Sequence, residues 1–157
     1  VHTFAAMTKG LAGEEMTEIG LLKRTGAIAF SNGKSSLANT RVMRNVLNYA
    51  KDFGALLVCH TEDPYLSGSA AMNSGEVASR LGLSGVSKLA ETIVLERDVR
   101  LVELTKGRYH AATITCAESL DVVRKAKAAK LNVTCGVSIN HLTLNENDIG
   151  SYRTFLK

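Results

Sequence analysis

The residues best suited to chemistry form one short stretch, Leu56-Leu57-Val58-Cys59-His60-Thr61-Glu62-Asp63. Four apolar or soft residues run directly into a histidine, a threonine and two acids. The apolar run is too short for a helix and predicts a buried parallel strand. Because α/β folds place their chemistry just past the carboxyl ends of such strands, His60 is the leading candidate for a functional side chain.

Of the residues next to His60 in the sequence, only the two acids are expected to interact with its imidazole. Glu62 and Asp63 could accept hydrogen bonds from the imidazole or orient it, although acids after a strand more often cap helices or anchor loops. Adjacent residues of a strand point to opposite faces, so Cys59 is not expected to form a nucleophilic pair with His60. A hydrolytic metal site needs further His or carboxylate ligands from other strands.

The other predicted strand ends are poor in catalytic residue types. We expect His2 and His110 at the beginnings of strands and in structural roles, whereas His141 follows the last strand and could face the site. No Gly-rich phosphate loop follows any strand. The polar residues expected at strand carboxyl ends are Thr8, Lys9, Ser31, Asn32, His60–Asp63, Thr113–Cys116 and Ser138–His141.

The elements that must position these residues alternate between strand and helix. Such alternation predicts a parallel sheet with right-handed crossovers. Thr115 and Glu118 have the spacing of a capping box, and the stretch 62–86 reads as a long polar loop. The strands are expected near 3–7, 27–30, 55–60, 110–115 and 133–138, and the helices near 13–26, 40–53, 87–106 and 116–130.

Five strands fit two α/β architectures: an open doubly wound sheet, or the middle five βα units of a (β/α)8 TIM barrel. The chain starts on a strand without a Met and stops in a polar stretch, and a complete barrel needs about 200 or more residues. We therefore expect residues 1–157 to be a partial barrel domain, with the N- and C-terminal parts of the barrel outside this chain.

The composition limits which classes of partner and which cellular compartment we expect for this chain. Hydrophobic residues make up 45% and charged residues 22% of the 157 positions, and the net charge is +4. With four Phe, four Tyr and no Trp, the chain lacks the basic and aromatic surface that stacks nucleic acid. No apolar run approaches the ~20 residues of a membrane helix. Three cysteines without CxxC spacing favour a reducing compartment, so we expect a cytoplasmic protein that binds neither nucleic acid nor membrane.

Many short phrases, in order along essentially the whole chain, resemble the dihydroorotases, which belong to the amidohydrolase superfamily of metal-dependent (β/α)8 barrels. These phrases are Thr8-Lys9-Gly10 with Gly13-Glu14-Glu15, His60-Thr61-Glu62-Asp63, Arg80-Leu81-Gly82-Leu83 with Gly85, Ala90-Glu91, Glu96-Arg97-Asp98, Gly107-Arg108-Tyr109-His110, Glu118-Ser119 and Val133-Thr134. The resemblance implies an enzyme of pyrimidine biosynthesis that interconverts carbamoyl aspartate and dihydroorotate. It also implies zinc, held by a His-x-His pair on the first strand, a carboxylate on the fourth, a His on each of the fifth and sixth, and an Asp on the eighth.

Within this resemblance, only one of three ligand positions that the chain contains keeps a ligand. His60 matches the fifth-strand histidine. Asn32, followed by Gly33, stands where the family has a pair of Asp residues, and Thr113 stands where it has the sixth-strand histidine. A phrase that usually reads Glu-Val-Thr-Pro-His-His-Leu is Gly136-Val137-Ser138-Ile139-Asn140-His141-Leu142. Thr is a weak neutral ligand and Asn carries no charge, so zinc is expected to be absent or weakly bound.

These substitutions lead to a first hypothesis and two alternatives. The chain is most similar to non-catalytic dihydroorotase-like homologues of bacteria, which implies a pseudoenzyme that assembles with aspartate transcarbamoylase, and we also expect a homo-oligomer. The first alternative is an active zinc-dependent dihydroorotase with a reduced metal site built on His60. The second alternative is a stand-alone five-stranded α/β domain unrelated to barrels.

Overall fold

The computed structural model describes residues 1–150. Its main sheet has five parallel strands in the order β1-β2-β3-β6-β7, and a small parallel sheet pairs β4 with β5. The elements are, in chain order, β1 (Thr3–Ala6), η1 (Lys9–Leu11), α1 (Ile19–Arg24), β2 (Ala27–Ser31), α2 (Thr40–Asp52), β3 (Leu56–Cys59), α3 (Pro64–Ser67), β4 (Met72–Asn73), α4 (Glu76–Leu81), β5 (Gly85–Val86), α5 (Leu89–Thr105), β6 (Arg108–Ala111), α6 (Ala117–Ala128), β7 (Val133–Cys135), α7 (Ile139–Thr143) and η2 (Glu146–Ile149).

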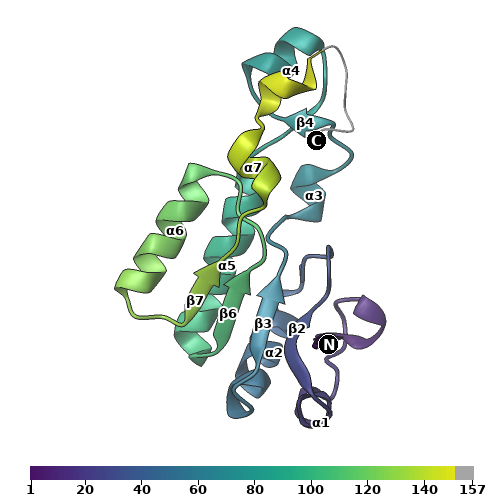
Figure 1. Ribbon diagram of the computed structural model, residues 1–157, viewed down its shortest axis with the longest axis vertical. Coiled ribbons are helices and arrows are strands. Elements are labelled where there is room, and N and C mark those ends of the chain that lie inside the picture. Colours follow the sequence, from purple (N-terminus) through teal and green to yellow (C-terminus); the bar gives the residue numbers. More distant parts are fainter. Residues whose placement is uncertain (151–157) are drawn as a thin grey trace.

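The strand order confirms the barrel prediction and excludes the doubly wound alternative. A doubly wound sheet reverses its strand order at a switch point and carries helices on both faces. Here the strands of the main sheet follow the chain order without reversal. Helices α1, α2, α5 and α6 contact one another in that order and cover one face of the sheet (Figure 1). This is the arrangement of consecutive βα units in a (β/α)8 barrel.

The core lies between this helical layer and the sheet. Leu57 and Tyr109 are fully buried on the helix-facing side, and they pair in register across β3 and β6. Their neighbours Val58 and His110 point to the other face and are half-buried. Because alternate strand residues are buried against the helices, the strands are apolar in sequence, and their predicted bounds were accurate to within a few residues.

Helix α2 shows how local sequence sets an element. Its apolar residues Val42, Met43, Val46 and Leu47 are buried along one face. The side chain of Asn39 caps the first turn by accepting hydrogen bonds from the N–H groups of residues 41 and 42. Gly54 ends the helix in the left-handed region with φ +59°, as its sequence position predicts.

Two of the sequence predictions were wrong in extent. The helix expected over 13–26 is only Ile19–Arg24, because Gly13 takes φ +78° and Thr8 pairs with Met16 in an isolated bridge that occupies the preceding residues. The stretch 62–86 is not a plain loop: it folds into α3, β4, α4 and β5, with Met72 and Ala78 buried in a small second core. Among residues 1–150, every helix is too short or too polar to span a lipid bilayer.

Candidate functional site

His60 lies directly after β3, at the carboxyl end of the strand. Its ring nitrogen Nε2 is 2.9 Å from Oε2 of Glu62, and both side chains are about one-third exposed. Cys59 points the other way, where it is buried in the core and its Sγ lies 4.0 Å from the sulfur of Met7. The predicted division of faces between Cys59 and His60 is therefore confirmed, and Glu62 is the acid that orients the imidazole.

The other two residues of this stretch have structural roles. Thr61 is buried, and its hydroxyl donates to the carbonyl of Thr113 on the neighbouring strand end at 3.4 Å. Asp63 caps α3, because its Oδ1 accepts hydrogen bonds from the N–H groups of Tyr65 and Leu66. The acid in this position is thus a helix cap, as is usual after a strand.

Asn32, which follows β2, is hydrogen-bonded to Thr8, which follows β1. Its Nδ2 donates to Oγ1 of Thr8 at 2.7 Å, and its Oδ1 accepts from the N–H of Thr8 at 3.2 Å. The same hydroxyl of Thr8 accepts from the N–H of Gly13 at 2.9 Å. Both residues are buried, Asn32 with 2% of its surface exposed. The Asn32 amide therefore fastens two strand ends together with both of its polar atoms.

The segment after β6, which carries Thr113, is held by the first turn of α5. The carboxylate of Glu91 accepts from the N–H of Thr115 at 3.0 Å and from its hydroxyl at 2.5 Å. The predicted capping box of Thr115 and Glu118 was therefore wrong: Cys116 is the N-cap of α6, without a side-chain cap, and Glu118 pairs with Lys88. The N–H and hydroxyl of Thr115 are hydrogen-bonded to Glu91 of α5 instead of to groups in the first turn of α6.

Two further histidines, His110 and His141, are hydrogen-bonded to hydroxyl groups. His110 is the third residue of β6 rather than its first, and its Nδ1 is 2.8 Å from the hydroxyl of Thr134. Burial lowers the pKa of His110. His141 lies in α7, where its Nδ1 contacts the hydroxyl of Ser138 at 2.7 Å. The His110 contact crosses from β6 to β7 and the His141 contact is local, and neither histidine is hydrogen-bonded to His60.

Backbone packing closes the space between the ends of β6 and β7. A Cβ atom on Gly136 would lie 2.5 Å from the carbonyl oxygen of Ala112, a distance that real Cβ atoms do not adopt. The N–H of Gly136 donates to the carbonyl of Ala111 at 2.9 Å. Position 136 therefore accepts only glycine without a shift of the backbone.

The side chains at these strand ends do not match the donor set that zinc prefers. Structural and catalytic zinc sites take three or four ligands from Cys, His and carboxylates. Within residues 1–150, no three His, Cys, Asp or Glu side chains are grouped closely enough to hold a metal ion. Asn32 and Thr113 are neutral, and both polar atoms of the Asn32 amide are already bonded to Thr8.

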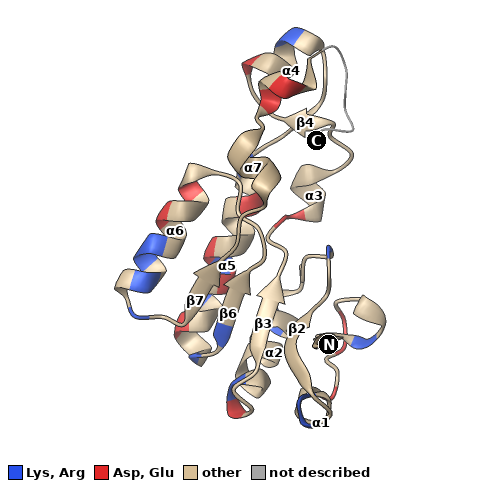
Figure 2. Ribbon diagram, in the orientation of Figure 1, with Lys and Arg blue, Asp and Glu red and all other residues tan. Residues whose placement is uncertain are grey.

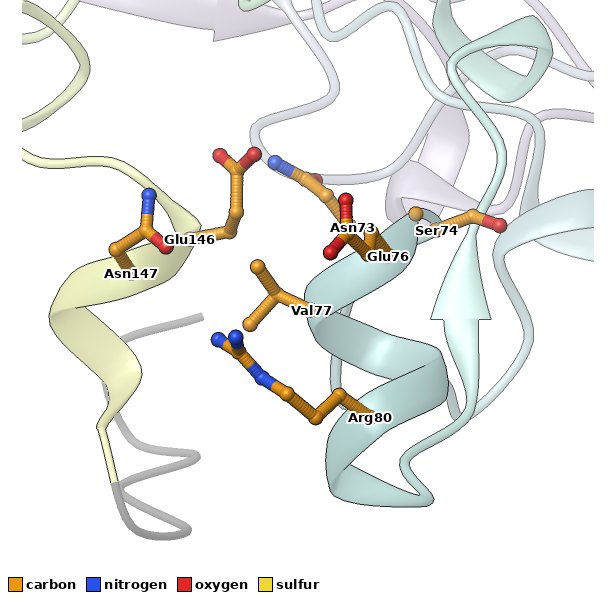
Figure 3. Close-up of a pocket in the computed structure, with 8 residues that line it drawn as sticks. Asn73, Ser74, Glu76, Val77, Arg80, Glu146 and Asn147 are labelled. Carbon is orange, nitrogen blue, oxygen red and sulfur yellow. The ribbon is translucent and has the colours of Figure 1, made fainter.

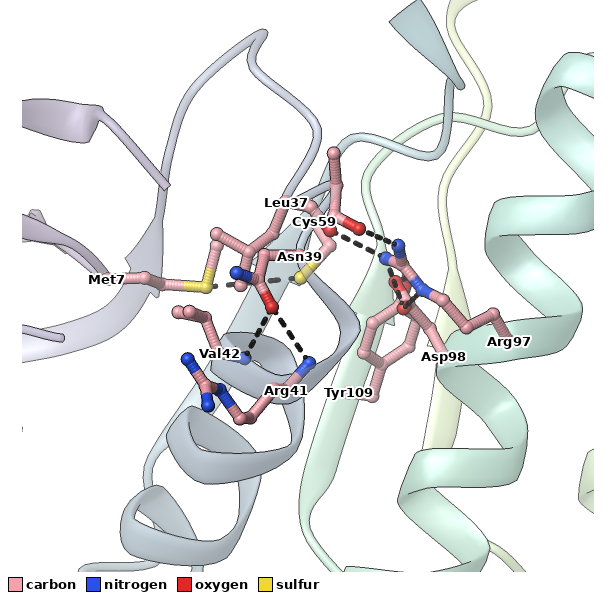
Figure 4. A network of polar contacts seen from close by, with 10 residues as sticks. Met7, Leu37, Asn39, Arg41, Val42, Cys59, Arg97, Asp98 and Tyr109 are labelled. Atoms are coloured by element: carbon pink, nitrogen blue, oxygen red, sulfur yellow. Dashed lines mark hydrogen bonds and ion pairs between the residues drawn. The ribbon is translucent and has the colours of Figure 1, made fainter. Parts of the chain in front are cut away.

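A buried ionic cluster lies behind the strand ends and was not anticipated from the sequence (Figure 4). Arg97 contacts the adjacent Asp98 carboxylate at 2.7 Å and donates to the carbonyls of Leu37 and Ala38. The Tyr109 hydroxyl donates to the other oxygen of Asp98 at 2.8 Å. The available signal was the position of Asp98, which falls on the same helix face as the buried Val94 and Val102.

Burial dominates the electrostatics of this cluster. It raises the pKa of Asp98 above the ordinary carboxyl value, although the Arg97 guanidinium and the Tyr109 hydroxyl act in the opposite direction. Burial and the neighbouring Asp98 together raise the pKa of Tyr109 well above its usual range. The cluster joins α5, β6 and the segment before α2, and it consists of groups that are fully engaged with one another.

A separate pocket of about 260 Å³ opens between α4 and η2 (Figure 3). Its lining includes the charged side chains of Glu76, Arg80 and Glu146. These side chains are all exposed, and none of the residues that line the pocket belongs to the carboxyl end of a main-sheet strand. The pocket is therefore distinct from the surroundings of His60.

Comparison with solved structures agrees with the barrel assignment. The fold is similar to that of a D-hydantoinase, with a TM-score of 0.68 and 19% sequence identity over 94% of this chain and 34% of that one. It is also similar to dihydropyrimidinase from Brevibacillus agri, with a TM-score of 0.69 and 16% identity over 99% of this chain and 35% of that one. Identities this low support the fold alone.

Sequence comparison identifies the family. The chain is 36% identical to a dihydroorotase of Desulforapulum autotrophicum over 157 residues, and 40% identical to one of Anaeromyxobacter sp. strain K over 151 residues. These matches cover 100% and 96% of this chain but 37% and 35% of the relatives, so the chain spans about a third of their length. The family described as "Dihydro-orotase-like" matches residues 1–119. On that match, which extends from β1 into α6, the chain belongs to the dihydroorotase-like family.

Proposed function

We propose that this chain is the central part of a catalytically degenerate dihydroorotase-like protein of pyrimidine biosynthesis, whose partner is aspartate transcarbamoylase. The remaining parts of its barrel lie outside these 157 residues. The observation that carries the proposal is the engagement of Asn32 with Thr8. An amide whose two polar atoms are both bonded to a neighbouring strand end supplies neither the negative charge nor the free oxygen of a metal ligand.

The surroundings of Thr113 and Gly136 support the same proposal. Thr113 brings a neutral hydroxyl to a position where the family has a histidine, and its carbonyl already accepts a hydrogen bond from Thr61. Gly136 packs so closely on Ala112 that a side chain there would require a backbone shift. The strand ends have become a structural junction between neighbouring βα units.

One observation favours the alternative of a working enzyme with a reduced zinc site. His60 follows β3, its side chain is about one-third exposed, and Glu62 contacts its ring in the way that a carboxylate orients a metal-binding histidine. If zinc bound there with ligands from outside this chain, its role would be to activate water for attack on a cyclic amide. His60 would then be indispensable to that activity.

Two assays on the full-length protein test the proposal. Dihydroorotate hydrolysis should be undetectable and should not change in the His60→Ala variant. Addition of the full-length protein to aspartate transcarbamoylase should produce a larger, stable assembly in analytical ultracentrifugation. Measurable ring opening that disappears in His60→Ala would establish the alternative, and failure of the two proteins to associate would remove the proposed partner.

A further inference from the structure

Five exposed basic side chains gather at the amino-terminal end of β6 and β7, the end of the sheet opposite His60. This basic patch comprises Lys106, Arg108, Lys125, Lys127 and Lys130. The two segments that carry it lie side by side, because the N–H of Tyr109 donates to the carbonyl of Asn132 at 3.0 Å. Figure 2 shows the blue segments at the lower ends of α5 and α6.

Few carboxylates balance the patch. Residues 104–110 and 122–132 contain no acid; the nearest acids in the sequence are Glu103 and Asp121. Asp121 is paired with Arg124, which lies outside the patch. Among the residues that the structure describes, no ion pair involves a member of the patch. Arg108 donates to the carbonyl of Gly54 at 2.8 Å, which is a neutral acceptor, so none of the five charges is paired with a carboxylate among residues 1–150.

Helix dipoles explain some of these cations but not all of them. Lys125 and Lys127 lie in the last turn of α6, where positive charge is generally favourable. Lys106 and Lys130 lie just beyond their helices and take the left-handed conformation, with φ of +61° and +57°. That conformation strains any residue with a Cβ atom, and glycine is the usual choice at these positions.

The same fold provides an internal comparison. After α2, the N–H of Gly54 donates to the carbonyl of Lys51 and the N–H of Ala55 to that of Ala50. After α6, the N–H of Lys130 donates to the carbonyl of Lys127 and the N–H of Leu131 to that of Ala126. The two helix ends have the same geometry, yet one uses glycine and the other a strained lysine. Strain that is kept where glycine would remove it indicates a role for the side chain.

We infer that the basic patch is the surface on which this protein docks an acidic face of its partner enzyme. The inference rests on the proposed function, because the partner is the transcarbamoylase named there. A protein fits this surface better than a nucleic acid does. Leu104, beside the patch, exposes 68% of its surface and lines a groove of about 360 Å³ between α2 and α5. Tyr109, the one aromatic residue in the two segments, is fully buried and offers no stacking platform.

The experiment measures the affinity of full-length protein for aspartate transcarbamoylase by surface plasmon resonance at several salt concentrations. The double variant Lys106→Gly with Lys130→Gly removes two charges and the backbone strain together. We expect it to bind about tenfold more weakly and with a shallower salt dependence, while its thermal unfolding midpoint rises by a few degrees. Lys106→Glu with Lys130→Glu should weaken binding by about a hundredfold. The matched control Lys9→Gly, at the opposite end of the sheet, should bind like the wild type.

Each other outcome has a distinct meaning. If the wild type binds and both double variants bind equally well, the docking surface is wrong and the proposed function stands. If the wild type does not bind the transcarbamoylase, both proposals fall. If an RNA duplex binds the wild type and is lost in the double variants while the transcarbamoylase still binds them, the surface belongs to nucleic acid and the inference is overturned.

Discussion

At the scale of single residues, hydrogen bonds between side chains and backbone hold the strand ends together. Asn32 and Thr8 are hydrogen-bonded to each other, Thr61 donates to the carbonyl of Thr113, and the partly exposed His60 contacts Glu62. Burial raises the pKa of groups elsewhere, among them Asp98 and Tyr109, which form a cluster with Arg97 on the helix-facing side. Its role is to hold α5 to β6, so its energetics should appear in stability.

Replacing Tyr109 by Phe tests that role. The variant leaves one oxygen of the buried Asp98 without its 2.8 Å hydrogen bond, so the free energy of unfolding should fall by about 1–3 kcal/mol. Urea denaturation of full-length protein measures the change. Tyr49→Phe is the control, because Tyr49 packs on Phe53 by its ring edge; it should change the value by less than about 0.5 kcal/mol. Equal effects of the two variants would show that the Tyr109 hydroxyl contributes nothing.

The raised pKa of Asp98 predicts a pH dependence of stability. A carboxyl group whose pKa is higher in the folded state favours folding when protonated. Its contribution is complete below its ordinary pKa near 3.8 and is lost as the pH rises through the higher folded-state value. The free energy of unfolding of the wild type minus that of Asp98→Asn should therefore decrease as the pH rises from 4 to 7. A difference that increases instead would mean that Arg97 outweighs burial and lowers the pKa.

At the scale of elements, the first turn of α5 fastens two strand-end segments. The carbonyl of Ala90 accepts from the N–H of Asp63 at 2.8 Å, and Glu91 holds Thr115. One helix end thus fixes the segments that follow both β3 and β6. The sequence marks Ala90-Glu91 only as a family phrase, because a contact between residues 24 positions apart has no local pattern.

Loss of the Glu91 carboxylate should loosen the segment after β6 selectively. In Glu91→Gln the charged acceptor of the Thr115 N–H and hydroxyl becomes a neutral amide, so the backbone N–H groups of 112–116 should exchange with deuterium several times faster. Mass spectrometry of peptides from the full-length protein measures the rate. Glu96→Gln, an exposed position on the same helix, should leave those peptides unchanged. Unchanged exchange in both variants would show that Glu91 does not restrain the segment.

At the scale of the whole molecule, the fold could be predicted far better than the state of the site. Apolar runs predict buried parallel strands such as Leu56–Cys59. The alternation of strands and helices predicts that the strands lie in the sheet in the order of the chain. The segment 62–86 was missed because its two-residue strands β4 and β5 are too short to show a period. The Arg97–Asp98 cluster was missed because two adjacent charges in a helix resemble a solvated face, and only the tertiary structure buries them.

The metal content of the purified full-length protein tests the central claim most directly. Inductively coupled plasma mass spectrometry, with dihydroorotate hydrolysis measured on the same sample, should find well under one zinc per chain and no hydrolysis, because Asn32 and Thr113 supply no charged or imidazole ligand. Supplementing the growth medium with zinc should not change either result. One or more tightly bound zinc ions per chain, together with hydrolysis that is lost in His60→Ala, would contradict the account.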